Sequence, residues 1–217
     1  MQTADGSKTI QLPQWGEQYH SMHGALQEAL HVFIGKGLYQ FENRPLELLE
    51  VGLGTGLNAL LTLLEAPGRN LSIRYTGLEA YPVAAEEWQQ LNYPDLLEAR
   101  EAARRYFKAL HTAPWGVDVP VTPSFTLHKR RVDIRTFEAE PAYDLIYFDA
   151  FGARVQPELW TALIFGRMFR SLQPGGSLVT YSAKGSVRRA MQQVGFEVER
   201  LPGPPGKREM LRASKPM

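Results

Sequence analysis

The chain has 217 residues, 44% of them hydrophobic, and its 24 Lys and Arg nearly balance 23 Asp and Glu, giving a net charge of +1. This length suits one α/β domain, and the near-neutral charge excludes a general attraction to nucleic acid, so an RNA partner needs local basic patches. The absence of cysteine excludes disulfides, thiolate metal sites and a cysteine nucleophile. With no leader-like N-terminus and no apolar run of about 20 residues, a cytoplasmic protein without membrane contact is expected.

From Leu46 onward, apolar runs alternate with amphipathic stretches, which predicts an α/β domain with a doubly wound, mostly parallel seven-stranded sheet. The predicted strands are Leu46–Val51, Ser72–Leu78, Phe125–Lys129, Tyr143–Asp149, Ser177–Ser182, Phe196–Arg200 and Glu209–Arg212. The predicted helices are Leu57–Glu65, Val83–Leu91, Leu96–Leu110, Glu158–Leu172 and Ser186–Val194. The turn at 202–206 is too short for a crossover helix, so the last two strands are predicted to be antiparallel neighbours. Residues 42–217 thus form the predicted domain, and residues 1–41 a small appendage over its site.

The appendage contains a polar and aromatic stretch, Tyr19 to Gly24, followed by Glu28, that is predicted to line the site rather than enter a core. His20, His23 and His31 lie in or near it. These histidines do not share one helical face and no carboxylate-rich motif accompanies them, so no metal site is expected.

The first strand ends in Glu50 and Val51 and runs into a glycine-spaced turn formed by Gly52, Gly54 and Gly56. Such glycines let the backbone approach a ligand closely, and the following helix offers free N–H groups. The turn lacks the Lys-Ser/Thr of a phosphate-binding loop and the G-x-G-x-x-G spacing of a dinucleotide site. S-adenosylmethionine fits better, because Glu50 can attract its cationic amino acid. The alternative is a plain strand-to-helix turn whose ligand differs or is absent.

Acidic residues at the ends of later strands are the next candidates, because ligands of doubly wound sheets bind beyond the carboxyl ends of the strands. Glu79 lies one β-α unit after Glu50, where a carboxylate commonly binds ribose hydroxyls; the alternative is a helix-start carboxylate. Asp133 is a candidate for the adenine amino group, or a turn aspartate with local backbone bonds.

Asp149 follows a nearly wholly apolar strand, which predicts a central strand that delivers this carboxylate to the cofactor edge. A carboxylate there can attract an amine, orient it and take its surplus proton. A structural aspartate that caps the next segment is the alternative. Phe151 and Trp160 can stack on a base, although an aromatic residue on an amphipathic helix, such as Trp160, is more often core.

Four short basic clusters are candidate RNA contacts, although each alone is typical of a solvated face. They are Arg104-Arg105 with Lys108, Lys129-Arg130-Arg131, Arg188-Arg189 and Lys207-Arg208.

Taken together, these residues resemble the methyltransferase domain of the bacterial MnmC-type enzymes, especially the stand-alone MnmD-like form. The resemblance covers most of the chain. The matching elements are Tyr19-His20-Ser21 to Gly24, Glu28, His31-Val32-Phe33, Leu49 to Asn58 with its G-T-G-L-N run, Phe148-Asp149-Ala150-Phe151, Pro157-Glu158-Leu159-Trp160, Pro174-Gly175-Gly176, Tyr181-Ser182-Ala183, Val187-Arg188-Arg189, Gly195-Phe196 and Gly206-Lys207-Arg208-Glu209-Met210-Leu211.

The resemblance implies a Rossmann-like methyltransferase fold, S-adenosyl-L-methionine as donor, and 5-aminomethyl-2-thiouridine of the tRNA anticodon arm as acceptor. It implies that Asp149 orients the acceptor amine, and it adds Tyr19, Ser21 and Asn58 to the expected cofactor-binding residues. Phe151, Arg188, Arg189, Lys207 and Arg208 are the expected substrate-binding residues.

Two departures from the family pattern stand out. Leu53 replaces a phenylalanine that is often found between the first glycines, and this change leaves the loop geometry alone. The sequence ends at Met217 without the FAD-dependent oxidase domain of two-domain relatives, so only the methylation half-reaction is expected and another enzyme would supply the aminomethyl substrate. A small-molecule amine methyltransferase, an aminopropyl transferase and a non-catalytic cofactor- or RNA-binding module are the alternatives.

Overall fold

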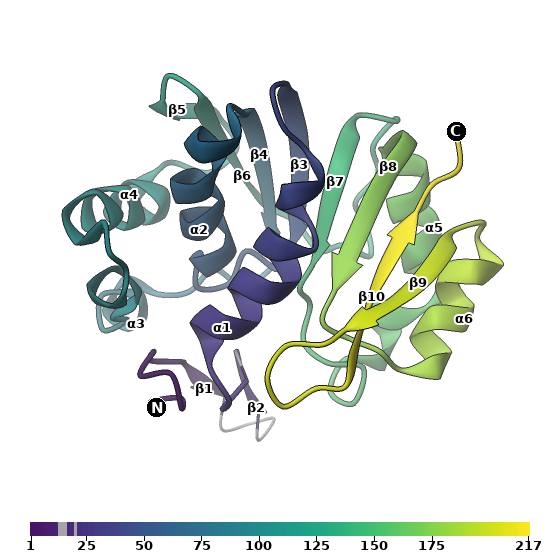
Figure 1. The fold of residues 1–217 in the computed structure, drawn as a ribbon, viewed down its shortest axis with the longest axis horizontal. Helices are drawn as coiled ribbons and strands as arrows, with labels where there is room; N and C mark the ends of the chain where they lie inside the picture. Colours follow the sequence, from purple (N-terminus) through teal and green to yellow (C-terminus); the bar gives the residue numbers. More distant parts are fainter. Residues whose placement is uncertain (13–16, 20) are drawn as a thin grey trace.

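The computed structural model describes residues 1–12, 17–19 and 21–217. Within them, an eight-stranded sheet has the order β5-β6-β4-β3-β7-β8-β10-β9 (Figure 1). Its strands are β3 (Pro45–Val51), β4 (Ser72–Glu79), β5 (Asp118–Thr122), β6 (Phe125–Arg131), β7 (Tyr143–Phe148), β8 (Leu172–Thr180), β9 (Glu197–Pro202) and β10 (Glu209–Ser214). The pairs among β6, β4, β3, β7 and β8 are parallel, which confirms the predicted mostly parallel sheet.

The helices follow the predicted order. They are α1 (Ala25–Ala29), α2 (Leu57–Glu65), α3 (Ala85–Trp88), α4 (Arg100–Thr112), α5 (Ala162–Ser171) and α6 (Gly185–Gln193). Single turns of π- or 3₁₀-helix are η1 (Leu30–Gly35), η2 (Leu38–Gln40), η3 (Ala66–Arg69), η4 (Tyr93–Leu96) and η5 (Pro157–Trp160). A separate two-stranded sheet of β1 (Gln11–Leu12) and β2 (Glu17–Gln18) lies near the N-terminus (Figure 1).

Of two predictions about the strands at the sheet edges, one is confirmed and one is wrong. The predicted antiparallel pairing of the last two strands is confirmed, since β10 pairs antiparallel with β9 and also with β8. The predicted number of seven strands is one too few, because β5 adds an antiparallel edge strand beside β6. Pro120 lies inside β5, and a strand pattern that contains proline is compatible only with an edge position, where a backbone N–H is not needed on both sides.

The two faces of the sheet bury different residues of each strand, because successive side chains of a strand point to opposite faces. Leu46 and Leu48 of β3 join the core formed with α1, η1, α2 and α4. Leu49 and Val51 join the core formed with α5 and α6. Glu50 has the parity of Leu48, so its side chain points under α2.

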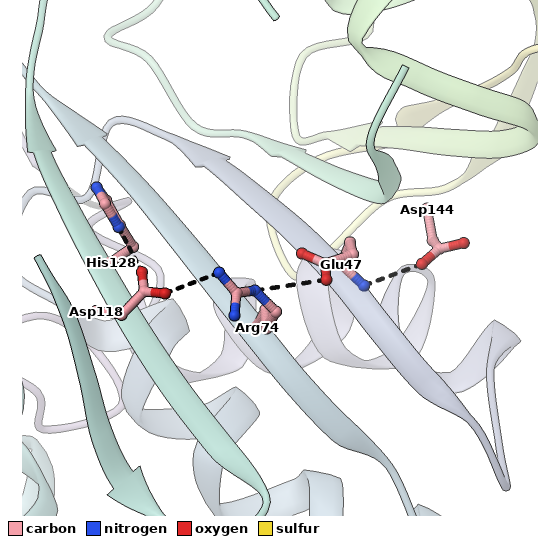
Figure 2. Close-up of polar contacts among 5 residues, drawn as sticks. All are labelled: Glu47, Arg74, Asp118, His128 and Asp144. Carbon is pink, nitrogen blue, oxygen red and sulfur yellow. Dashed lines mark hydrogen bonds and ion pairs between the residues drawn. The ribbon is translucent and has the colours of Figure 1, made fainter. Parts of the chain in front are cut away.

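The face of the sheet that carries Leu49 and Val51 is not covered by a helix over β4 and β6. The reason is that the connection 132–142 between β6 and β7 is irregular. Polar side chains occupy this part of the face instead (Figure 2). Arg74 pairs with Asp118 at 2.8 Å and with Glu47 at 3.5 Å, and His128 Nδ1 lies 2.6 Å from an Asp118 oxygen. The backbone N–H of Glu47 donates to Asp144 at 2.9 Å. Such exposed pairs contribute little stability, so this part of the sheet is a solvated face rather than a core.

Candidate functional site

A cavity of about 830 Å³ lies at the carboxyl ends of β3, β4, β6 and β7. This is where doubly wound sheets bind ligands, and its volume falls within the range of roughly 300–1,000 Å³ typical of small-molecule sites. Four parts of the chain line the cavity together: the N-terminal segment (residues 1–41), the glycine turn, the strand ends and the loop before β10 (residues 203–208). The predicted site residues among them are Tyr19, Ser21, Gly52, Gly54, Asn58, Glu79, Asp133, Asp149, Phe151 and Lys207.

The glycine turn forms one wall of this cavity, and a side chain would be strained at two of its positions. Gly52 has φ +85°, and a Cβ there would lie 2.7 Å from the carbonyl oxygen of Asp149. Gly54 has φ +48°, and a Cβ there would lie 3.1 Å from the ring of Tyr19. Gly56 begins α2 in the left-handed region and does not line the main cavity. The turn therefore keeps a close approach open between the strand end and the N-terminal segment.

Glu79 ends β4 with its carboxylate fixed in the cavity wall. One oxygen accepts a hydrogen bond from the backbone N–H of Gly54 and the other from that of Tyr81, both at 2.9 Å. Burial raises the pKa of Glu79, and these N–H donors oppose that effect. The backbone N–H of Ala80 also bonds this carboxylate, which has about four acceptor positions, so the group can still accept a bond from a ligand hydroxyl.

Asp133 also lines the cavity, but Arg135 already occupies its carboxylate. The guanidinium of Arg135 donates to it at 2.6 and 3.0 Å, and the backbone N–H of Arg135 donates at 2.8 Å. The hydrogen bonds from Arg135 lower the pKa of Asp133. Asp133 thus has the local bonds of a turn aspartate while it borders the cavity.

Asp149 follows β7 on the same face as Glu50, and Asn58 lies between the two carboxylates. The Asn58 amide nitrogen donates to Glu50 Oε1 and to Asp149 Oδ2, each at 2.8 Å. The hydroxyl of Tyr75 donates to the other oxygen of Glu50 at 2.7 Å. Burial raises the pKa of Glu50 well above its usual value. Glu50 is fully buried and does not line the cavity, so it offers no direct contact for the amino acid part of a cofactor.

Burial raises the pKa of Asp149 to about 7, and the nearby carboxylate of Glu28 adds to the rise. The hydrogen bond from Asn58 and the charge of Lys207 act in the opposite direction. A partly buried carboxylate with a pKa near neutrality can exchange a proton with a bound group under physiological conditions.

Lys207 lies in the wall of the cavity, where its ammonium pairs with Glu28 and sits 4.1 Å from the ring centre of Tyr181. Glu28 belongs to α1, so this contact joins the N-terminal segment to the loop before β10. His31 Nε2 also lies 2.8 Å from the carbonyl oxygen of Pro202, at the other end of that loop. Lys207 is therefore engaged within the protein, unlike a solvated lysine.

The two aromatic candidates, Phe151 and Trp160, lie in different surroundings. Phe151 lines the cavity with its ring centre 4.9 Å from that of Tyr19. Trp160 is 5% exposed, packs against Phe148, and donates from its indole nitrogen to the Phe151 carbonyl at 2.8 Å. Trp160 is thus a core residue.

Three predicted basic residues lie outside the cavity. Arg189 and Arg208 are exposed, whereas Arg188 is partly buried and its Nε has no hydrogen-bond partner. His20 falls outside the described residues. Within the described part of the chain, no three His, Cys, Asp or Glu side chains gather in a metal-binding group, and no helix is long and apolar enough to cross a membrane.

The chain is similar to curated proteins of the MnmC type. The bifunctional tRNA 5-methylaminomethyl-2-thiouridine biosynthesis protein MnmC of Paracidovorax citrulli is 31% identical over 219 residues, which cover 93% of this chain and 33% of that protein. MnmC of Cupriavidus necator is 32% identical over 217 residues, which cover 93% of this chain and 32% of that protein. The chain thus spans about a third of the length of these curated relatives.

Solved structures share the fold. MNMC2 from Aquifex aeolicus has a TM-score of 0.78 at 27% identity, with 100% of this chain and 71% of that chain covered. The methyltransferase SibL has a TM-score of 0.53 at 15% identity over 86% of this chain and 54% of that chain, which shows the fold alone. A family model described as an S-adenosyl-L-methionine-dependent methyltransferase matches residues 106–216, which are 111 of the 217 residues. The chain has the Rossmann-like fold of these solved structures. It belongs to this family of S-adenosyl-L-methionine-dependent methyltransferases, and S-adenosyl-L-methionine is its methyl donor.

Proposed function

We propose that this protein methylates the primary amine of 5-aminomethyl-(2-thio)uridine at the wobble position of tRNA, giving the 5-methylaminomethyl derivative. The single observation that carries the proposal is Asp149, a carboxylate with a pKa of about 7 that borders the same cavity as the glycine turn. The names of the MnmC relatives, which match this chain over a third of their length, supply the RNA substrate.

The cofactor fits the residues that are present. Gly52 and Gly54 line the cavity without side chains, so a ligand can approach their backbone closely, and Glu79 offers acceptors that suit ribose hydroxyls. Tyr19 and Ser21 border the cavity from the N-terminal segment. When bound, S-adenosyl-L-methionine supplies a methyl group attached to a positively charged sulfur.

Asp149 acts on the acceptor amine. A protonated amine has no free lone pair, so it must lose a proton before its nitrogen can bond to a methyl group. The Asp149 carboxylate accepts that proton and becomes a carboxylic acid, while the neutral amine keeps its electron pair. The carboxylate also holds the amine in orientation, which favours an in-line displacement.

We assign the RNA contact to exposed basic residues that follow cavity-lining residues in the chain. Arg208 follows Lys207, which lines the cavity, and Arg189 lies on α6 shortly after Tyr181, which lines it too. Because Lys207 pairs with Glu28, we assign the phosphate contacts to Arg189 and Arg208 in the first place.

Mass spectrometry of tRNA nucleosides tests this function. Purified protein, S-adenosyl-L-methionine and tRNA bearing 5-aminomethyl-2-thiouridine should yield 5-methylaminomethyl-2-thiouridine at the wobble position. The matched reaction contains free amines and polyamines in place of tRNA. Methylation of these amines with no product on tRNA would favour a small-molecule methyltransferase and contradict the proposal.

A further inference from the structure

Asn58 occupies an unusual position, because both hydrogens of its amide face carboxylates. Its nitrogen lies 2.8 Å from Glu50 Oε1 and 2.8 Å from Asp149 Oδ2, and the residue is 4% exposed. A primary amide has two N–H donors, so these two bonds use all of its donor capacity. When Asp149 is charged, the flipped amide would place its oxygen against an acceptor, so the orientation with the nitrogen toward Asp149 is the one that bonds the charged carboxylate.

We propose that Asn58 is a positioning residue that holds the Asp149 carboxylate in the orientation needed by the acceptor amine, instead of serving mainly as a cofactor ligand. The proposal rests on the proposed function for the identity of the acceptor. Its structural part, the coupling of Asn58 to Asp149, does not depend on the acceptor.

The anchor of Asn58 is rigid. Glu50 lies on β3 in the centre of the sheet, and its second oxygen accepts the hydroxyl hydrogen of Tyr75 on β4. Tyr75 is fully buried, with its ring stacked on that of Phe125 at 5.5 Å. A side chain held by packing and by a fixed partner can in turn hold a third group within narrow limits. The sheet thereby determines where the Asp149 carboxylate points.

Charged groups act on Asp149 from α1, from β3 and from the loop before β10. Glu28 of α1 favours its protonated form, whereas Lys207 of the loop before β10 favours its charged form. Glu50 of β3 lies on the far side of Asn58. The Asn58 N–H is the neutral donor in this set, and it bonds directly to the charged form of Asp149. Loss of this donor therefore raises the pKa of Asp149, an effect that loss of a merely structural contact would not produce.

The test is an NMR titration of protein labelled with ¹³Cγ-aspartate, in which the Asp149→Asn variant identifies the Asp149 signal. For Asn58→Ala, the midpoint of that signal should move to higher pH, and the affinity for S-adenosylhomocysteine measured by calorimetry should be retained. The single-turnover rate on tRNA should fall by up to about 10²-fold, as a misplaced reacting group allows. Asn58→Ser, which keeps one donor, should show a smaller shift in the same direction and covers the case in which the alanine variant does not fold.

Thr62→Val is the matched control. Thr62 lies one turn along α2, is fully buried, and donates its hydroxyl to the backbone carbonyl of Asn58 at 2.7 Å without a bond to Asp149. This variant should leave the Asp149 titration unchanged. An unshifted midpoint in both Asn58 variants, or lost cofactor affinity with an unshifted midpoint, would overturn the proposal. Because the titration needs no tRNA, a shift seen with an inactive wild-type protein would refute the proposed function alone.

Discussion

Glu28 and Lys207 form an ion pair in the wall of the cavity, although 179 positions separate them in the sequence. The pair brings one negative and one positive group near Asp149, and the two act on the pKa of Asp149 in opposite directions. Burial is the main cause of the raised pKa of Asp149, and the N-terminal segment and the loop before β10 adjust that pKa from outside the strand that carries Asp149.

The first prediction separates these two charges. Glu28→Gln removes a charge that raises the pKa of Asp149, so the rise of the single-turnover rate with pH should move to lower pH. Lys207→Met removes a charge that lowers this pKa and leaves Glu28 unpaired, so the same rise should move to higher pH. A pH series of single-turnover methylation measures both. Shifts of the two variants in the same direction would contradict this electrostatic account.

The second prediction concerns the glycine turn. Gly54→Val places a β-branched side chain in the left-handed region and beside Tyr19, so S-adenosyl-L-methionine affinity measured by calorimetry should be lost. Circular dichroism should show that the variant remains folded. Gly68→Ala is the control, because a Cβ there meets nothing within 4 Å. Full affinity in Gly54→Val would mean that the cofactor binds elsewhere.

The positions of the central strands along the chain could be predicted because these strands are almost wholly apolar and end at charged or glycine residues. The predicted helix 83–91 is shorter in the structure, at Ala85–Trp88. Four residues after this helix ends, the Asn92 side chain forms a long-range contact with the backbone of Gly6 and Lys8. No periodic pattern reveals such a contact.

Part of the candidate site could be predicted from the positions of the strand ends. Glu79 and Asp149 are recognisable because a position at the end of a parallel strand is enough to place a side chain at the cavity. The sequence does not tell which face of the sheet α2 covers, so it does not reveal that Glu50 is buried beneath Asn58. Long-range pairs such as that of Lys207 are likewise visible only in the folded chain.

The third prediction concerns tRNA. Arg189→Ala and Arg208→Ala should each weaken tRNA binding and reduce the slope of log affinity against log salt by up to about 0.9, the value for one phosphate contact. Cofactor affinity should not change. Lys108→Ala tests the basic cluster that the proposal leaves out and should leave tRNA binding unchanged, because Lys108 is exposed on α4, on the other side of the molecule from α6 (Figure 1). Unchanged tRNA binding in the double arginine variant would remove these residues from the RNA surface.

The fourth prediction is that Asp149→Asn loses activity and gains stability. The turnover number should fall by about 10²–10⁴-fold, the usual cost of a lost acid-base group, while cofactor affinity is retained. The folded-state pKa of Asp149, about 7, lies above its ordinary value of 3.8. The wild-type protein therefore has its full stability from this group below about pH 3.8 and loses it as the pH rises through 7.

Asparagine carries no charge and can still accept the hydrogen bond from Asn58, so the variant avoids that loss. Its melting temperature should exceed that of the wild type at pH 8, by an amount that corresponds to roughly 1–3 kcal/mol, and the difference should shrink toward pH 4. Asp118→Asn is a control with the opposite expected sign, because the hydrogen bond from His128 lowers the pKa of Asp118 (Figure 2). Loss of the Asp118 charge should therefore destabilise the protein slightly at pH 8. A melting temperature of Asp149→Asn that follows the wild type at every pH would show that the Asp149 carboxylate titrates as an ordinary solvated aspartate, which would leave it unsuited to act as the base near neutral pH.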